Sequence, residues 1–158
     1  MISTEQLVGN FKRILDELLA KTNASRTTLR LDVPARGFQV NGVVTEALAP
    51  GIKSIAAETS LQQRKSQTAG FLEQNRQILV QNDCANAVPN PPKELMQIYG
   101  TKAQMMAPVV RGADMVGWLS VHYNLSTRDW SSEDVAALEA ALAATHKEMD
   151  VMDKGVPQ

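Results

Sequence analysis

Two amphipathic helical patterns frame this chain of 158 residues, and all of its strand-like segments lie between them. Near the N-terminus, Ser3 occupies a capping position, and apolar residues then recur at spacings of four, three and four: Leu7, Phe11, Ile14 and Leu18. Near the C-terminus, a three-four rhythm of apolar residues follows Ser131 and continues to Met152. These patterns predict helices over 1–22 and 131–152.

The segment between these helices, 26–123, is predicted to form a sheet. Alternating or apolar stretches recur in it: "TTLRLDV", "FQVNGVVTEAL", "RQILVQND", "AQMMAPVV" and "MVGWLSVHYN". Short helices are expected within 51–72 and in "PKELMQIYG". This order predicts an α+β fold, with a single domain over 1–158. A central antiparallel sheet would carry the terminal helices on one face and an elaborate insertion on the other.

Charge, hydropathy and cysteine content exclude several classes of function. The formal net charge is −1 and no basic stripe is present, so we expect no nucleic-acid partner. No apolar run approaches the roughly 20 residues that span a bilayer, and the N-terminus lacks the pattern of a signal peptide. Cys84 is the single cysteine, so no intrachain disulfide can form. These features predict a cytoplasmic protein with no membrane association.

The C-terminal third carries a more specific pattern. The run "APVVRGADMVGWLSVHYNLSTRDWSSEDVAALEAALA" contains an apolar strand, a turn with glycine, a strand centred on Gly117, the connection "RDWSSED" and an amphipathic helix. Together with the upstream "NRQILVQND", it resembles a GAF domain. The resemblance implies a GAF/PAS-like fold, in which loops and short helices form a small-molecule pocket on the sheet face opposite the terminal helices. Those helices often dimerise in this family.

The resemblance also locates the candidate ligand-binding residues. Alternate strand residues share a face, so Trp118, Ser120 and His122 are expected in the pocket, whereas Leu119 and Val121 are expected to pack on the helices. The adjacent strand, the short helix above the pocket and the pocket rim supply further candidates: Gln104, Met106, Tyr99 and Arg76. Each has a structural alternative: a loop carbonyl for the His122 imidazole, core packing for Trp118 and solvation for Arg76.

The cofactor remains unknown from the sequence. Gly117 and His122 match the spacing seen in bilin-binding relatives, but no cysteine–histidine pair is present, so covalent bilin attachment is not expected. His122 is also a candidate axial haem ligand, without a clear second ligand. His122 and His146 lie on different predicted elements and no carboxylate cluster has ligand spacing, so no metal site is predicted.

Cys84 is the candidate for catalysis, as in the free methionine sulfoxide reductases of this family. Those enzymes rely on several cysteines, and the neighbouring Asp83 should raise the pKa of the thiol. The leading hypothesis is therefore a stand-alone, non-catalytic bacterial domain that binds a small molecule. It would act as a sensor, regulator or ligand carrier, as a homodimer through its terminal helices and with a partner protein. The alternatives are the thiol-dependent enzyme, a haem or redox-cofactor sensor, and a purely structural dimerisation module.

Overall fold

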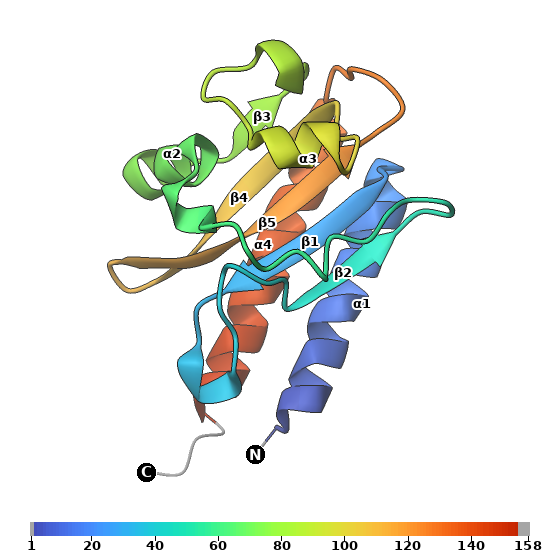
Figure 1. Ribbon diagram of the computed structural model, residues 1–158. Helices are drawn as coiled ribbons and strands as arrows, with labels where there is room; N and C mark the ends of the chain where they lie inside the picture. The colour runs from blue at the N-terminus through green and yellow to red at the C-terminus, as the bar shows by residue number, and fades with distance from the viewer. Residues whose placement is uncertain (1, 155–158) are drawn as a thin grey trace.

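The computed structural model describes residues 2–154 (Figure 1). Residues 1 and 155–158 of the predicted domain lie outside the described residues. The helices are α1 (Thr4–Thr22), α2 (Gln67–Asn75), α3 (Lys93–Gln97) and α4 (Ser132–Lys154). The strands are β1 (Arg26–Leu31), β2 (Thr45–Leu48), β3 (Leu79–Gln81), β4 (Ala103–Arg111) and β5 (Asp114–Tyr123). No helix among the described residues is long and apolar enough to cross a membrane.

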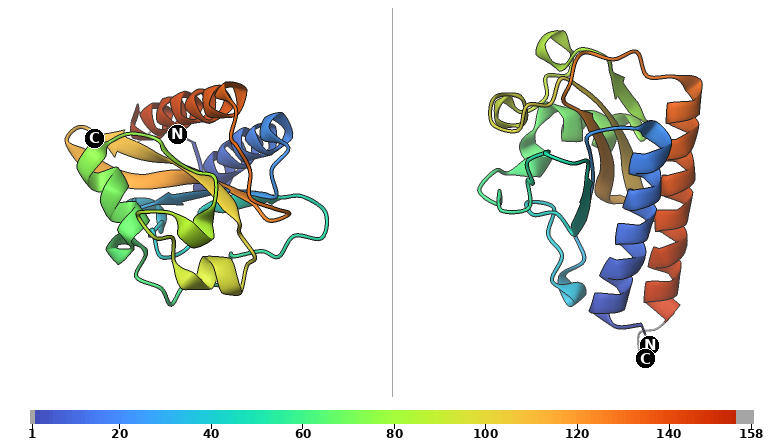
Figure 2. Two further views of the ribbon diagram at one scale, coloured as in Figure 1. Left: turned by 90° about the horizontal axis from the view of Figure 1, so that it is seen from above. Right: turned by 90° about the vertical axis from the view of Figure 1, so that its right-hand side faces the viewer.

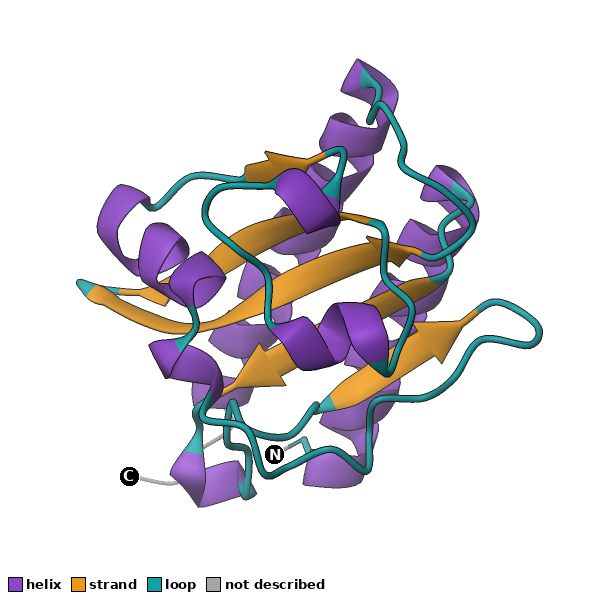
Figure 3. Cartoon of the chain, turned by 45° about the horizontal axis from the view of Figure 1, so that its top comes forward, coloured by secondary structure: helices purple, strands orange, loops and turns teal. Residues whose placement is uncertain are grey.

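The strands form one antiparallel sheet in the order β2-β1-β5-β4-β3. Helices α1 and α4 lie side by side on one face, as the right-hand view of Figure 2 shows. The opposite face is covered by α2, α3 and the long connections (Figure 3). The predicted α+β class, with terminal helices on one face and an insertion on the other, is therefore confirmed.

The terminal helices form because their ends are capped and their apolar faces are buried. Ser3 and Gln6 form a capping box at the start of α1, and Ser131 and Asp134 exchange equivalent hydrogen bonds at the start of α4. The apolar faces of both helices pack on the sheet in one core, with these buried members: Leu7, Phe11, Leu15, Leu18, Leu138, Met149 and Met152. The apolar residues whose spacing predicted the helices are thus largely the residues that the helices bury against the sheet.

Strand β5 lies between β1 and β4 and sets the face of each residue. Ser120 pairs with Thr28 on β1 and with Met106 on β4, and His122 pairs with Arg26 and Gln104. At Gly117, a Cβ atom would lie 1.9 Å from the carbonyl oxygen of Arg30, so only glycine permits this approach of β1 to β5. The register therefore places Arg26, His122 and Gln104 side by side across β1, β5 and β4.

The connection from β1 to β2 differs from the prediction. The sequence suggested a strand over 38–48, but β2 covers only Thr45–Leu48. Pro34 starts a short 3₁₀ turn, and the Asp32 carboxylate accepts a hydrogen bond from the Val40 backbone amide. These local bonds replace a continuous ladder, and the Val40 side chain turns into a small core beneath α2.

Candidate ligand-binding site

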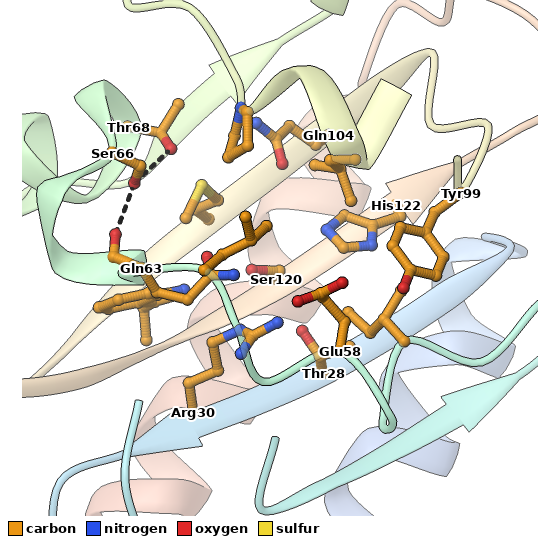
Figure 4. A pocket seen from close by; sticks show the side chains of 16 residues that line it. Thr28, Arg30, Glu58, Gln63, Ser66, Thr68, Tyr99, Gln104, Ser120 and His122 are labelled. Carbon is orange, nitrogen blue, oxygen red and sulfur yellow. Dashed lines mark hydrogen bonds between the residues drawn. The ribbon is translucent and has the colours of Figure 1, made fainter. Parts of the chain in front are cut away.

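A partly enclosed cavity of about 40 Å³ lies on the sheet face opposite α1 and α4 (Figure 4). Its floor is formed by β1, β4 and β5, and its cover by α3, the start of α2 and the 55–63 segment. A water molecule occupies about 10–15 Å³ on this measure, so the cavity holds a few waters or a compact ligand. Six apolar residues line it: Ile55, Leu61, Pro92, Leu95, Met106 and Trp118.

Six of the seven residues predicted to contact a ligand line this cavity. They are His122, Trp118, Ser120, Gln104, Met106 and Tyr99. The alternation of β5 explains the placement, because Leu119 and Val121 between them are buried in the core beneath the terminal helices. Gln104 is already engaged, since its side-chain amide donates to the side chain of Gln81 at 2.8 Å.

Arg76 is not in the cavity lining, contrary to its predicted place at the pocket rim. It caps the C-terminus of α2 in the left-handed region (φ 53°). Its guanidinium donates to the carbonyl oxygens of Glu73 and Ala113, at 2.9 and 3.1 Å. The turn after α2 directs the side chain toward the β4–β5 hairpin, and a sequence pattern carries no signal for that direction.

Cys84 also lies outside the cavity lining. It begins a 3₁₀ turn after β3 and is buried. Burial, and then the charge of Asp83, raise the pKa of the thiol to about 12. The thiol is therefore protonated at neutral pH and is a poor nucleophile.

His122 presents one ring nitrogen to the protein and the other to the cavity (Figure 4). Its Nδ1 lies 3.1 Å from Nη1 of Arg26, and a guanidinium can only donate, so Nδ1 accepts this bond. Burial, followed by the charges of Arg26 and Arg30, lowers the pKa of His122 well below its ordinary value. The imidazole is therefore neutral, with its proton on Nε2, and offers an N–H donor to the cavity.

Arg30 is the buried cation of the cavity, and the sequence analysis did not select it. Its side chain is only 5% exposed and points inward from β1 (Figure 4). Within residues 2–154, its guanidinium donates to one acceptor, the Val40 carbonyl oxygen, at 2.9 Å. Burial lowers the pKa of Arg30 to about 10, which leaves it charged at neutral pH. Several of its N–H groups therefore remain available.

Two further polar groups lie near Arg30. The Thr28 hydroxyl is buried and has no hydrogen-bond partner in the described part of the chain. Glu58 points toward the cavity from the covering segment (Figure 4), and hydrogen bonds from Ser60 lower the pKa of its carboxylate. These residues were not among the predicted site residues. The alternation of β1 separates Arg30 from Leu29 and Leu31 but does not reveal what covers its face, and Glu58 lies in a segment without a regular pattern. The available signal was that Thr28 and Arg30 share a strand face.

Arg26 shows what a fully satisfied buried arginine looks like in this fold. It has no exposed surface, and its guanidinium contacts the Lys53 and Tyr99 carbonyl oxygens, the Thr101 hydroxyl and His122. These contacts attach the covering segment and the end of α3 to the sheet. Arg26 thus serves the structure, whereas Arg30 retains free donors.

This architecture defines an α+β domain with a polar cavity over an antiparallel sheet. The family model for the GAF domain matches residues 7–145, so the chain belongs to the GAF domain family. A comparison with curated proteins finds no match.

The solved structures with the same fold include domains of cyanobacteriochromes and of a bacteriophytochrome. The GAF domain of the cyanobacteriochrome TePixJ has a TM-score of 0.74 at 13% identity, covering 92% of this chain and 90% of that one. GAF3 of Slr1393 from Synechocystis sp. PCC6803 has 0.71 at 16%, covering 95% and 99%. The chromophore-binding domain of a bacteriophytochrome from R. palustris has 0.71 at 20%, covering 95% and 57%. Similarity at these identities establishes the fold.

Proposed function

We propose that this GAF domain binds a small molecule non-covalently in the cavity and acts as a sensory or regulatory domain, or as a ligand carrier. Two buried polar groups in the cavity carry the proposal. The Arg30 guanidinium has free hydrogen-bond donors, and the Thr28 hydroxyl has no hydrogen-bond partner among the described residues. An unsatisfied buried polar group costs about 1–3 kcal/mol. A ligand that accepts these hydrogen bonds would recover that free energy.

Non-covalent binding is favoured over the alternatives by the position and chemistry of Cys84 and by the size of the cavity. The thiol is outside the cavity lining and its pKa is raised to about 12, which argues against both covalent bilin attachment and a thiol-dependent reductase. The cavity of about 40 Å³ is too small for a tetrapyrrole or haem in this conformation.

The sheet offers a path from the cavity to the terminal helices. Thr28 lines the cavity, and the hydroxyl of the adjacent Thr27 donates to the Leu15 carbonyl oxygen of α1 at 2.9 Å. A ligand that shifts β1 would therefore act directly on α1. We infer that occupancy changes the position of the terminal helices, which would transmit the signal to a partner.

We also propose a homodimer, formed through the outer surface of the terminal helices and not through the predicted apolar stripe of α4. The Leu and Met stripe of α4 is buried in the core of the protein itself, so it is not available to a second chain. The outer surface of α4 instead exposes small residues, and a shallow groove between α1 and α4 is lined largely by Ile14 and alanines of α4. A dimer would form through this outer surface.

A ligand screen on the intact protein tests the proposed binding function. Binding to the folded form raises the unfolding midpoint and changes the fluorescence of Trp118 in the cavity wall. Compounds that raise the midpoint of the wild type should have a smaller effect on Thr28→Val and an unchanged effect on Arg76→Met, since Arg76 is outside the cavity. A broad screen by thermal shift and native mass spectrometry that yields no binder, or only binders indifferent to Thr28→Val, would contradict the proposal.

A further inference from the structure

The hydrogen-bond donors of the cavity converge from one face of two neighbouring strands. Arg30 and Thr28 are two residues apart on β1, and His122 lies on β5, where its neighbour Ser120 pairs with Thr28. The Arg30 guanidinium, more than nine-tenths buried, donates to one protein acceptor among the described residues. Nε2–H of His122 supplies a second kind of donor to the same space. Such a set suits a ligand group that only accepts hydrogen bonds.

The charges around the cavity limit the charge of that group. Arg30 contributes one positive charge, and the imidazole of His122 is neutral. Arg26 is charged, but its donors are engaged by protein groups. Glu58 lies at the covering segment with a carboxylate that stays ionised, and its charge interacts with that of Arg30. Arg30 therefore offers a single positive charge to a ligand group, and a doubly charged group would meet more repulsion from Glu46 and Glu58, the two carboxylates that act on Arg30.

Apolar side chains form another part of the cavity wall. Ile55, Leu61 and Leu95 belong to the cover, and Met106 and Trp118 to the floor. An apolar part of a ligand makes no hydrogen bonds to water, so it can move from water to these side chains without losing any. The cavity of about 40 Å³ favours a compact body.

We propose, on the basis of the proposed binding function, that the ligand is a small monocarboxylate with an apolar body, whose carboxylate binds Arg30, Thr28 and His122. One carboxylate oxygen accepts from the guanidinium and the other from the hydroxyl or the imidazole N–H. Glu58 acts as a charge filter that disfavours dianions. Acetate and propanoate are suitable probes, because each joins a single carboxylate to an apolar group short enough for a cavity of about 40 Å³.

The test compares these probes with neutral and dianionic analogues of similar size, by isothermal titration calorimetry at constant ionic strength. We expect acetate to bind at least about 10-fold more tightly than acetamide, and propanoate more tightly than propanamide. Arg30→Met should abolish this preference, and Arg76→Met should leave it intact. Thr28→Val keeps the shape of the side chain and the arginine, and should weaken carboxylate binding about 5- to 10-fold.

Glu58→Gln tests the filter independently of the floor of the cavity, because Glu58 is on the exposed covering segment. This variant should bind oxalate and phosphate more tightly relative to propanoate than the wild type does. Amides that bind as well as acids, or a carboxylate preference unchanged in both Thr28→Val and Arg30→Met, would overturn the monocarboxylate inference and leave the binding function in place. If no carboxylate and no compound of the broad screen binds in the cavity, both proposals fall.

Discussion

His122 is the residue whose ionisation links the cavity to protein stability. It is neutral in the folded protein because burial and two arginine charges lower its pKa, whereas in the unfolded chain its pKa is about 6.5. Below pH 6.5 the unfolded state therefore binds more protons, and the free energy of unfolding should fall as the pH decreases, by up to about 1.4 kcal/mol per pH unit from this group.

His122→Gln removes this titration and retains an acceptor for Arg26. Urea unfolding of both proteins between pH 7.5 and 5 should show a shallower loss of stability for the variant, while the carboxylates contribute equally to both. Parallel curves would mean that His122 is not held neutral in the folded protein.

Gly117 illustrates a constraint that the backbone imposes on a single position. A side chain there would meet the backbone of Arg30, so Gly117→Ala should force β1 away from β5 and lower the free energy of unfolding by about 3 kcal/mol. Gly9→Ala is the matched control, because Gly9 is exposed in α1 and nothing lies within 4 Å of an added Cβ. That change should stabilise the protein by about 0.5–1 kcal/mol. Effects of equal sign in equilibrium unfolding would refute this account.

The sequence predicted which face of the sheet each β5 residue occupies, but it did not predict that Arg30 supplies the positive charge of the cavity. Alternation along β5 separates Trp118, Ser120 and His122 from the core residues, because a strand has a fixed period of two. The same alternation places Arg30 on the face of β1 opposite Leu29 and Leu31, but it does not show what covers that face. It could not reveal that the segment around Glu58, nearly 30 residues later, folds back over β1.

Helices and the β4–β5 hairpin could be predicted because their stability is local: caps, apolar stripes and a turn glycine, Gly112 at φ 60°. The cover of the cavity depends instead on contacts distant in sequence. Arg64 donates to the Asp32 carboxylate and to the Met115 carbonyl oxygen, and Arg26 donates to the Lys53 carbonyl oxygen. A short window of sequence contains only one partner of each contact, so the path of this segment could not be derived.

At the level of elements, Arg128 joins the ends of the two terminal helices. Its guanidinium donates to the Thr22 carbonyl oxygen at the end of α1 and to both carboxylate oxygens of Asp134 in α4, and it stacks on the Trp130 ring at 4.3 Å. Because this group is mostly buried, Arg128→Ala should lower the free energy of unfolding by about 2–3 kcal/mol.

Arg111→Ala is the control for Arg128→Ala, since the Arg111–Asp153 ion pair is more exposed to solvent. Its loss should cost at most about 0.5–1 kcal/mol in the same chemical unfolding measurement. Similar effects of the two substitutions would show that Arg128 acts as an ordinary surface charge.

At the scale of the whole molecule, the two surfaces to which we assign functions lie on opposite sides of one sheet: the cavity and the outer surface of α1 and α4 (Figure 2). Signalling through the sheet requires that something be attached to the second surface, and a second copy of the chain is the proposed occupant. Alanines on α4 would allow two helices to approach closely, and Ala140 is exposed at the groove between α1 and α4. Glutamate at this position would bury a charge in the interface, at a cost that excludes association.

Analytical ultracentrifugation should therefore give a dimer for the wild type at tens of micromolar and a monomer for Ala140→Glu, which retains a good helix former. Gln97→Glu adds the same charge on α3, on the cavity side, and should remain dimeric. A monomeric wild type, or a dimer unaffected by Ala140→Glu, would place the output surface elsewhere. If the dimer forms as proposed, its dissociation constant should also change with a cavity ligand, because β1 contacts both the ligand site and α1.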